Sequence, residues 1–314
     1  MTLHVAVAIV GFRNADDIAH CLAALGRSTY ADFEVAICEN GGEAAWSALT
    51  AVLPAALAGG QPVQAELAPR NLGYAGGVNV CLAATPSADA WWVLNPDTVP
   101  EPGALAALVE RLVAGDCQAV GGTLVRPDGL VQSYGGRWRP WFARAESIGR
   151  GARVDERVDS AAVERSQSYL SGASMLVGRE FLATVGVMRE DYFLYCEEVE
   201  WFLRAARVGM RLGFAPGARV VHAHGATTGS GQRVSARPRM PIYLDERNKI
   251  LVTRDCFPWR LPIAALSAFA LIFARYGRQR AWPQLGYGLS GWLQGVLNRR
   301  GAPPFLLAGS GEGI

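Results

Sequence analysis

The chain has 314 residues, of which 50% are apolar and 18% are charged, so it is long enough for one large α/β domain or two smaller ones. The apolar content and a net charge of only +2 exclude a mainly disordered chain. Acidic and basic residues nearly cancel, which argues against nucleic acid as a partner. Lys249 is the only lysine, so 29 of the 30 basic residues are arginine.

The six cysteines form no C-x-x-C pair, and most lie among apolar residues. This pattern predicts buried, reduced thiols in a reducing compartment. The N-terminus lacks a basic leader and a small-residue cleavage site, so it indicates a buried first strand and not a signal peptide. We therefore expect a cytoplasmic protein.

The first hundred residues alternate apolar runs with segments of helical spacing. The expected strands are Val5–Val10, Phe33–Cys38, Gln64–Leu67 and Trp91–Leu94. The expected helices are Asp16–Leu25, Ala44–Leu57, Gly76–Ala84 and Gly103–Ala114. This alternation predicts a mostly parallel sheet that is covered by helices on both faces.

The rest of the chain is less regular. Gln118–Val125 continues the sheet, and residues 126–165 are expected to form long loops with a short hairpin. Order returns at Tyr169–Val177, followed by two helices (Arg179–Val185, Val199–Val208) and two strands (Arg211–Phe214, Ala218–Val221). From Pro241 onward the pattern predicts mostly helix.

Polar residues follow each of the first four expected strands. In an open α/β sheet, ligands bind at the carboxyl ends of the strands, so these residues should converge on one edge. The first strand–helix turn holds a single glycine, Gly11, which excludes a G-x-G-x-x-G dinucleotide site. A P-loop is excluded as well, because it requires a lysine that is absent there.

Three positions at strand ends could bind a metal or a nucleotide, and each has an alternative structural interpretation. Asp97 follows a buried strand and suits Mg²⁺ or Mn²⁺, although Asn95-Pro96-Asp97 is also a good turn. His222 and His224 end a strand, where His222 is a candidate metal ligand or a structural histidine. Glu39 could accept hydrogen bonds from a base or ribose, or could cap a helix.

Three carboxylates, Glu197, Glu198 and Glu200, occur among aromatic residues at a helix start. Apolar surroundings and like charges raise a carboxyl pKa, which suits a general base. Acidic residues also favour helix N-termini for electrostatic reasons alone.

Taken together, these segments resemble the family 2 inverting glycosyltransferases of the GT-A fold, in particular the rhamnosyltransferase-like branch of bacterial polysaccharide synthesis. The resemblance covers roughly residues 3–255. It rests on five stretches in order, namely 71–79 (NLGYAGGVN), 94–97 (LNPD), 193–200 (FLYCEEVE), 221–225 (VHAHG) and 243–248 (YLDERN).

The resemblance implies roles for individual residues. Asp97 would bind the divalent cation, Mg²⁺ or Mn²⁺, with help from His222. Asn95 stands where the family has the first acid of its D-x-D motif. Glu198 matches the catalytic base, with Glu197 as the alternative. The donor would be bound by Phe12, Asn14, Glu39, Asn71, Gly73, Gly76, Gly77, Asn79, Asn95 and Asp97. Acceptor contacts or support would come from Glu200, Trp201, Arg204 and Arg247.

The resemblance also implies the reaction and the partners. An acceptor hydroxyl would attack the anomeric carbon of a nucleotide sugar, with dTDP-rhamnose as the first expectation and UDP-linked galactofuranose, glucose or N-acetyl hexosamines as alternatives. The acceptor would be a glycan or a polyprenyl-diphosphate-linked sugar. A non-catalytic sugar-nucleotide-binding protein on the same fold is the alternative from another class. A nucleotidyltransferase is disfavoured, since Gly11-Phe12-Arg13-Asn14 lacks a phosphate-binding glycine- and lysine-rich loop.

The expected organisation is a catalytic domain over residues 1–240, with a nucleotide-sugar half at 1–125 and an acceptor half at 126–240, and a helical segment at 241–314. The apolar run Leu261–Ala274 is shorter than the roughly 20 residues that span a bilayer. Trp259, Trp282, Tyr287, Trp292 and several arginines flank it. This mixture favours peripheral contact with the membrane, with a helical cap on the catalytic domain as the alternative.

Overall fold

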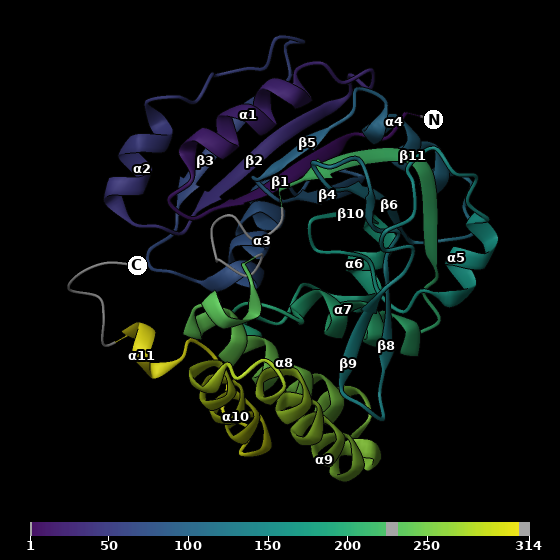
Figure 1. Ribbon diagram of the computed structural model, residues 1–314. Helices are drawn as coiled ribbons and strands as arrows, with labels where there is room; N and C mark the ends of the chain where they lie inside the picture. Colours follow the sequence, from purple (N-terminus) through teal and green to yellow (C-terminus); the bar gives the residue numbers. More distant parts are fainter. Residues whose placement is uncertain (1, 224–231, 308–314) are drawn as a thin grey trace.

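The computed structural model describes residues 2–223 and 232–307, which fold around one curled, mostly parallel sheet with helices on both faces (Figure 1). Its strands in this part of the chain are β1 (Val5–Gly11), β2 (Phe33–Glu39), β3 (Val63–Leu67), β4 (Ala90–Leu94), β5 (Thr98–Pro100), β6 (Ala119–Val125), β7 (Val131–Ser133), β10 (Ser174–Gly178) and β11 (Leu212–His222). Their order is β3-β2-β1-β4-β10-β6-β11-β5, and β7 pairs with β6. The predicted α/β fold is therefore confirmed.

The N-terminal half follows the predicted alternation of strand and helix. Its helices are α1 (Ala15–Leu25), α2 (Glu43–Thr50), α3 (Gly73–Ala84) and α4 (Ala104–Val113). The strands β1 to β4 run parallel to one another. The prediction of a helix over Ala44–Leu57 was too long, because α2 ends at Thr50 and the nearby Pro54 cannot continue a helix.

Side chains of β1 alternate between two cores. Val5, Val7 and Ile9 pack with apolar residues of α1 and α4, whereas Ala6 and Ala8 face the side covered by α3. Burial on both faces explains why the strand is apolar throughout and not alternating. All six cysteines are buried and free, as the sequence predicts.

The second half contains antiparallel strands that the sequence pattern did not predict. β10 runs antiparallel to both β4 and β6. The two strands expected at 211–221 are one long strand, β11, whose pairing with β6 is irregular between Ala215 and Arg219. The predicted hairpin is formed by β8 (Gly136–Arg139) and β9 (Arg144–Ser147). The helices here are α5 (Ser160–Ser166), α6 (Arg179–Val185) and α7 (Glu197–Arg207).

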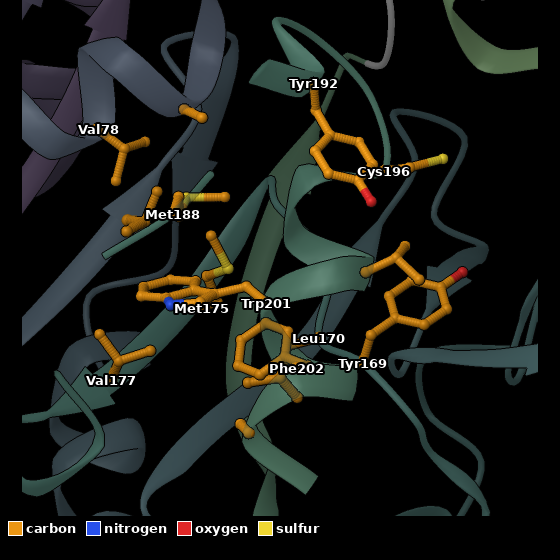
Figure 2. Close-up of a cluster of buried hydrophobic side chains, with 14 of the residues drawn as sticks. Val78, Tyr169, Leu170, Met175, Val177, Met188, Tyr192, Cys196, Trp201 and Phe202 are labelled. Carbon is orange, nitrogen blue, oxygen red and sulfur yellow. The ribbon is translucent and has the colours of Figure 1, made fainter. Parts of the chain in front are cut away.

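A large apolar cluster fixes α7 against the sheet (Figure 2). Trp201 and Phe202 of α7 are fully buried, and the Trp201 ring packs edge-on against Phe181 with ring centres 4.9 Å apart. Met175 and Val177 of β10 belong to the same cluster. The cluster thus sets the position of α7, whose first turn carries the acid pair.

The C-terminal segment is helical, as predicted, and packs below α7 (Figure 1). It contains α8 (Arg239–Cys256), α9 (Leu261–Ile272), α10 (Trp282–Val296) and α11 (Pro304–Leu307). The axes of α8 and α10 approach closely at Gly295, where a Cβ would lie 2.6 Å from the Arg247 carbonyl oxygen. A larger residue at Gly295 would therefore push the two helices apart.

The helix around α9 is longer than its apolar run. Short helical turns continue α9 at both ends, so that the stretch Pro258–Gly277 has 20 residues with a mean hydropathy of 1.2. By length and composition alone, it is the one described helix that could cross a membrane. The expectation that this segment is too short therefore holds for the apolar run but not for the helix.

Candidate active site

The carboxyl ends of β1, β2 and β4 meet at one edge of the sheet, where most of the predicted donor residues lie. The parallel register of β1 and β2 sets Gly11 directly beside Glu39. Phe12 and Asn14 follow Gly11, and the Asn14 side-chain oxygen accepts a hydrogen bond of 2.9 Å from the Phe12 backbone N–H. These bonds fix the turn between β1 and α1.

Glu39 is completely buried at the end of β2. Its Oε1 accepts hydrogen bonds from the backbone N–H groups of Gly41, at 2.7 Å, and Arg13, at 3.2 Å. Its Oε2 has no hydrogen-bond partner among the described residues. A buried carboxylate oxygen without a partner is costly, so this atom is suited to accept a hydrogen bond from a bound ligand.

Asn40 orders the loop that precedes α3, a role that the sequence analysis did not assign. Its amide donates to the Gly73 carbonyl at 2.9 Å and accepts from the Leu72 N–H at 3.2 Å. The Asn71 side-chain oxygen adds a 2.9 Å bond from the Gly73 N–H. The loop is thus fixed at both ends of its turn. The position of Asn40 directly after Glu39, at the same strand end, is the signal that could have identified it.

This loop also contacts the loop before the acid pair. Gly73 has a positive φ of 74° and lies against the Phe193 carbonyl, so no side chain fits there. The Tyr74 N–H donates to the same carbonyl at 2.7 Å, and its hydroxyl donates to the Gly172 carbonyl at 2.5 Å. The predicted donor loop and the acid pair are therefore brought together.

Glycines 76 and 77 permit close packing of α3. A Cβ at Gly77 would lie 2.5 Å from a Val10 methyl group, and one at Gly76 would lie 2.6 Å from the Leu72 Cβ. Asn79 is directed elsewhere, because its amide bonds the Met188 backbone and, at 2.9 Å, the Glu190 carboxylate. These three predicted donor residues therefore position α3 and the segment it contacts.

Asp97 and His222 meet because β5 pairs antiparallel with the end of β11, which sets His222 opposite Thr98. Asp97 Oδ1 lies 3.3 Å from His222 Nε2, and both side chains are less than a tenth exposed. The Gln132 amide lies 3.0 Å from the other ring nitrogen, Nδ1. Asn95 lies in the same turn, where its carbonyl accepts a 2.6 Å bond from the Thr98 hydroxyl.

The pair of Asp97 and His222 fits a hard divalent cation. Mg²⁺ and Mn²⁺ take one or two carboxylates and complete their shell with substrate phosphates and water. A ligating histidine usually has its second nitrogen bonded to an outer partner, the place that Gln132 fills here. No group of three or more His, Cys, Asp or Glu side chains gathers within residues 2–223 and 232–307. His224, the other histidine of this motif, lies outside those ranges.

The loop before α7 has an unusual backbone that α8 supports. Phe193, Tyr195 and Cys196 all have φ near +70°, a region that L-residues with side chains rarely adopt. The Asn248 side-chain nitrogen lies 3.0, 2.8 and 2.7 Å from the carbonyl oxygens of Tyr192, Leu194 and Tyr195. This contact compensates for the cost of the unusual backbone and fixes the direction of the loop.

The two members of the acid pair have different surroundings. Glu197 is buried, its Oε2 has no hydrogen-bond partner among the described residues, and burial beside Glu198 raises its pKa well above the usual range. Glu198 is partly exposed, and burial raises its pKa to about 7, with a further contribution from the Asp245 carboxylate. Burial thus disfavours the charged form of Glu197, whereas Glu198 can exchange a proton near neutral pH.

Two further groups face Glu198. Its Cγ lies 3.7 Å from the place of a Cβ on Gly172, next to the Tyr74 ring. Tyr169 is buried close to the Glu198 and Asp245 carboxylates, which together with its burial raise the pKa of its hydroxyl. Asp245 lies in the stretch 243–248 that the sequence analysis singled out, although it was given no role. Glu198 therefore lies between the donor loop and α8.

The other predicted acceptor or support residues stabilise the fold. Glu200 pairs with Arg204 at 3.0 Å, and Arg204 also donates to the Val185 and Val187 carbonyls. The Trp201 indole N–H donates to the Gly186 carbonyl at 2.9 Å. Arg247, almost fully buried, donates to the Tyr192 and Gly301 carbonyls. The support interpretation fits all four residues.

Comparison with known proteins was consistent with this geometry. Residues 3–240 match the profile of the family described as Glycosyltransferase like family 2. The chain is 30% identical over 187 residues to the N-acetylglucosaminyl-diphospho-decaprenol L-rhamnosyltransferase of Mycobacterium tuberculosis, and this match covers 51% of the chain and 58% of the relative. A weaker match, 21% over 140 residues, links it to the low-salt glycan biosynthesis hexosyltransferase Agl10 of Haloferax volcanii, covering 43% of the chain and 44% of that protein. The chain thus matches under two thirds of the length of these relatives.

Solved structures with the same fold include two that hold a nucleotide sugar. The mannosyltransferase PcManGT of Pyrobaculum calidifontis, in complex with GDP-Man and Mn²⁺, superposes with a TM-score of 0.57 at 15% identity, covering 95% of this chain and 88% of that one. TarS of S. aureus, in complex with UDP-GlcNAc, gives a TM-score of 0.56 at 12% identity over 94% and 82% of the two chains. At such identities the likeness concerns the fold alone. With the profile match, it shows that the chain belongs to glycosyltransferase family 2 and has the GT-A fold.

Proposed function

We propose that the protein is an inverting, metal-dependent glycosyltransferase that moves L-rhamnose from dTDP-rhamnose to a glycan or polyprenyl-diphosphate-linked acceptor in bacterial cell-surface polysaccharide synthesis. The observation that carries the proposal is the position of Glu198. It faces Tyr74 of the donor loop beside Gly172, with a pKa raised to about 7 by burial. The relative from M. tuberculosis, named for rhamnosyl transfer to a lipid diphosphate, supports the choice of sugar and acceptor.

The proposed reaction is a single displacement. The acceptor hydroxyl oxygen forms a bond to the anomeric carbon, and the bond from that carbon to the diphosphate oxygen breaks. The hydroxyl proton goes to the Glu198 carboxylate, and the nucleoside diphosphate leaves with the electron pair from the opposite face. General-base catalysis of this kind contributes roughly 10²–10⁴-fold. Glu197, whose charged form is disfavoured by burial beside Glu198, is proposed to take no part in this proton transfer.

The donor is proposed to lie across the strand ends. Glu39 would accept a hydrogen bond from the nucleoside through its unpartnered Oε2, beside Phe12 and Asn14. The loop at Asn71 and Gly73, ordered by Asn40, would contact the diphosphate and the sugar. A polar ligand at this edge would give the buried Glu39 carboxylate the hydrogen bond that its Oε2 lacks.

The cofactor is proposed to be Mg²⁺ or Mn²⁺ at Asp97 and His222, with Asn95 nearby. When bound, such an ion would neutralise the charge that develops on the leaving diphosphate. Gln132 would fix the His222 ring so that Nε2 faces the ion. Metal dependence is supported by this donor set, in which two protein ligands lie 3.3 Å apart.

We further propose the division of the chain into a catalytic domain over residues 1–240 and a helical segment over 241–314. The helical segment would rest on the inner face of the plasma membrane, where lipid-linked acceptors are found. The protein would then be peripheral and would reach its acceptor at the lipid surface.

Donor class can be tested by thermal unfolding with UDP, dTDP and GDP, each with and without Mn²⁺ or Mg²⁺. A ligand at 100 times its Kd adds about 2.7 kcal/mol to the free energy of unfolding, so we expect a metal-dependent rise with dTDP. Transfer is then measured from dTDP-rhamnose to N-acetylglucosaminyl-diphospho-lipid, and the anomeric configuration of the product is read by NMR. A rise with UDP alone would change the donor, and binding without transfer to any acceptor would indicate a binding protein.

A further inference from the structure

The outward face of α9 carries large apolar side chains, and its inward face carries mostly small ones. Ala264, Ala268 and Ile272 recur every four residues and are buried. By contrast, Leu266 is 70% exposed and Ile263 is 55% exposed. This arrangement is the reverse of a soluble surface helix, which buries its large apolar residues. Contiguous exposed apolar surface of this kind marks an interaction site.

The hairpin of β8 and β9 extends this surface. Its tip carries Trp141 and Phe142, which are 39% and 52% exposed. The Trp141 ring packs edge-on against Trp259 with ring centres 5.3 Å apart, and the Arg260 guanidinium lies over both rings. Figure 1 shows the hairpin reaching the level of α9 at the bottom of the molecule. Trp141, Phe142, Trp259, Ile263, Leu266 and Phe273 therefore form one surface, the α9–hairpin face.

The charge around this face is predominantly positive, and Glu146 of the hairpin is paired with Arg139. Residues 257–300 contain six arginines and no lysine or acidic residue, so this segment carries +6 and the rest of the chain sums to −4, given the net +2. Arg300 is paired with Asp255 and Arg275 lies near Glu246, but Arg278, Arg280 and Arg299 are exposed. Exposed arginines beside Trp and Phe are the composition of an interfacial, anionic-lipid-binding surface.

We propose that the α9–hairpin face binds the surface of an anionic phospholipid bilayer, with the hairpin tip and α9 inserting together. The inference rests on the proposed function, for which a lipid-linked acceptor must reach Glu198. The proposed membrane contact thereby gains the β8–β9 hairpin, which lies more than a hundred residues before α9 in the sequence. Trp292 is not part of this contact surface, because the Trp292 indole N–H donates to the Ala265 carbonyl within the helical layer.

The contacts of α9 explain why it lies along the membrane surface and does not cross it. Crossing would require α9 to leave α8 and α10, against which Ala264 and Ile272 are buried. A short chain of ion pairs also links this layer to the site. Arg275 lies 3.7 Å from Glu246, which together with Asp245 contacts Lys249. These ion pairs thus connect the segment after α9 to α8, the helix that borders Glu198.

Co-sedimentation of the full chain with vesicles of phosphatidylcholine and phosphatidylglycerol tests the proposal. We expect binding that weakens with added salt and on pure phosphatidylcholine. The double variant Trp141→Ser/Phe142→Ser should bind roughly tenfold more weakly or worse, as should Ile263→Ser/Leu266→Ser. Val52→Ser and Val113→Ser, which remove exposed apolar residues elsewhere, serve as matched controls and should bind like the parent chain.

Four outcomes would overturn the proposal. The first is a parent chain that stays in solution with both vesicle types, and the second is a hairpin variant that binds fully. The third is resistance to carbonate extraction, which would indicate a spanning helix. Fourth, if light scattering shows that the hairpin variant instead loses a dimer, a second copy covers the face. Transfer to a short-chain soluble acceptor, which these variants should retain, reports separately on the proposed function.

Discussion

The edge of the sheet proposed to bind the donor and the loop that precedes the acid pair are stabilised in different ways. At the proposed donor edge, the residues come from the ends of neighbouring strands. Glu39 accepts from the Gly41 N–H in the turn after its own strand, and Asn40 donates to the Gly73 carbonyl in the turn after the neighbouring strand. The loop before α7 has three residues with positive φ and relies on Asn248, more than fifty residues away in the sequence. The comparison teaches that the geometry of the strand ends follows from the sheet, whereas the geometry of the loop before α7 depends on a contact from the C-terminal helices.

The largest effect is expected at the acid pair, where the two members should differ sharply. Glu198→Gln removes the base and should lower kcat by roughly 10²–10⁴-fold while donor binding is retained. Glu197→Gln should lower it less than tenfold, because glutamine is close in shape to glutamate and burial already disfavours the charged form of Glu197. Rapid-quench transfer assays and donor titration measure both. Equal losses in the two variants would show that the pair acts as one unit, contrary to the assignment of Glu198 alone.

A second test concerns the donor side. Gln132→Leu removes the outer partner of His222 and should raise the Mn²⁺ concentration for half-maximal activity by roughly 10–100-fold. Asp97→Asn should raise it further, because it removes the only carboxylate of the pair. Metal titration of chelator-treated enzyme gives both values, and the binding of Mn²⁺ with dTDP can be followed by calorimetry. Full activity of Asp97→Asn without added metal would exclude this pair as the metal site.

The same contrast explains what the sequence could predict. The positions of Glu39 and Asp97 at one edge of the sheet could be predicted because parallel strands bring their carboxyl ends together there. Periodicity did not give the antiparallel direction of β10 or the single strand β11, since these depend on long-range pairing. The sequence placed Asn248 in a motif without a role, because its three carbonyl partners come from another part of the chain.

The third test asks how far the catalytic loop depends on α8. Asn248→Ala removes the donor to the Leu194 and Tyr195 carbonyls, while the Tyr192 carbonyl keeps its bond from Arg247. It should lower the free energy of unfolding by about 1–3 kcal/mol. We expect kcat to fall and the donor KM to change little, since the donor side has its own bonds. Thr253→Val is the matched control, because Thr253 is equally buried but donates only to the Lys249 carbonyl in its own helix. A parallel rise in donor KM would show that the two regions are not independent.

The smallest effect is expected in the pH profile. Glu198 must be deprotonated to act as a base, so kcat/KM should rise with pH and level off above about 7. Asp245→Asn removes a nearby negative charge and should move this limb to lower pH by less than one unit. At a given acidic pH, kcat/KM should therefore rise by less than a factor of ten. The effect on stability has the opposite sign. The pKa of Glu198 rises on folding from 4.5 to about 7. Its contribution to the free energy of unfolding is therefore fully present below pH 4.5 and is lost as the pH rises to 7. An unshifted limb in Asp245→Asn would mean that burial alone sets the pKa of Glu198, and that α8 fixes the position of the base without tuning its charge.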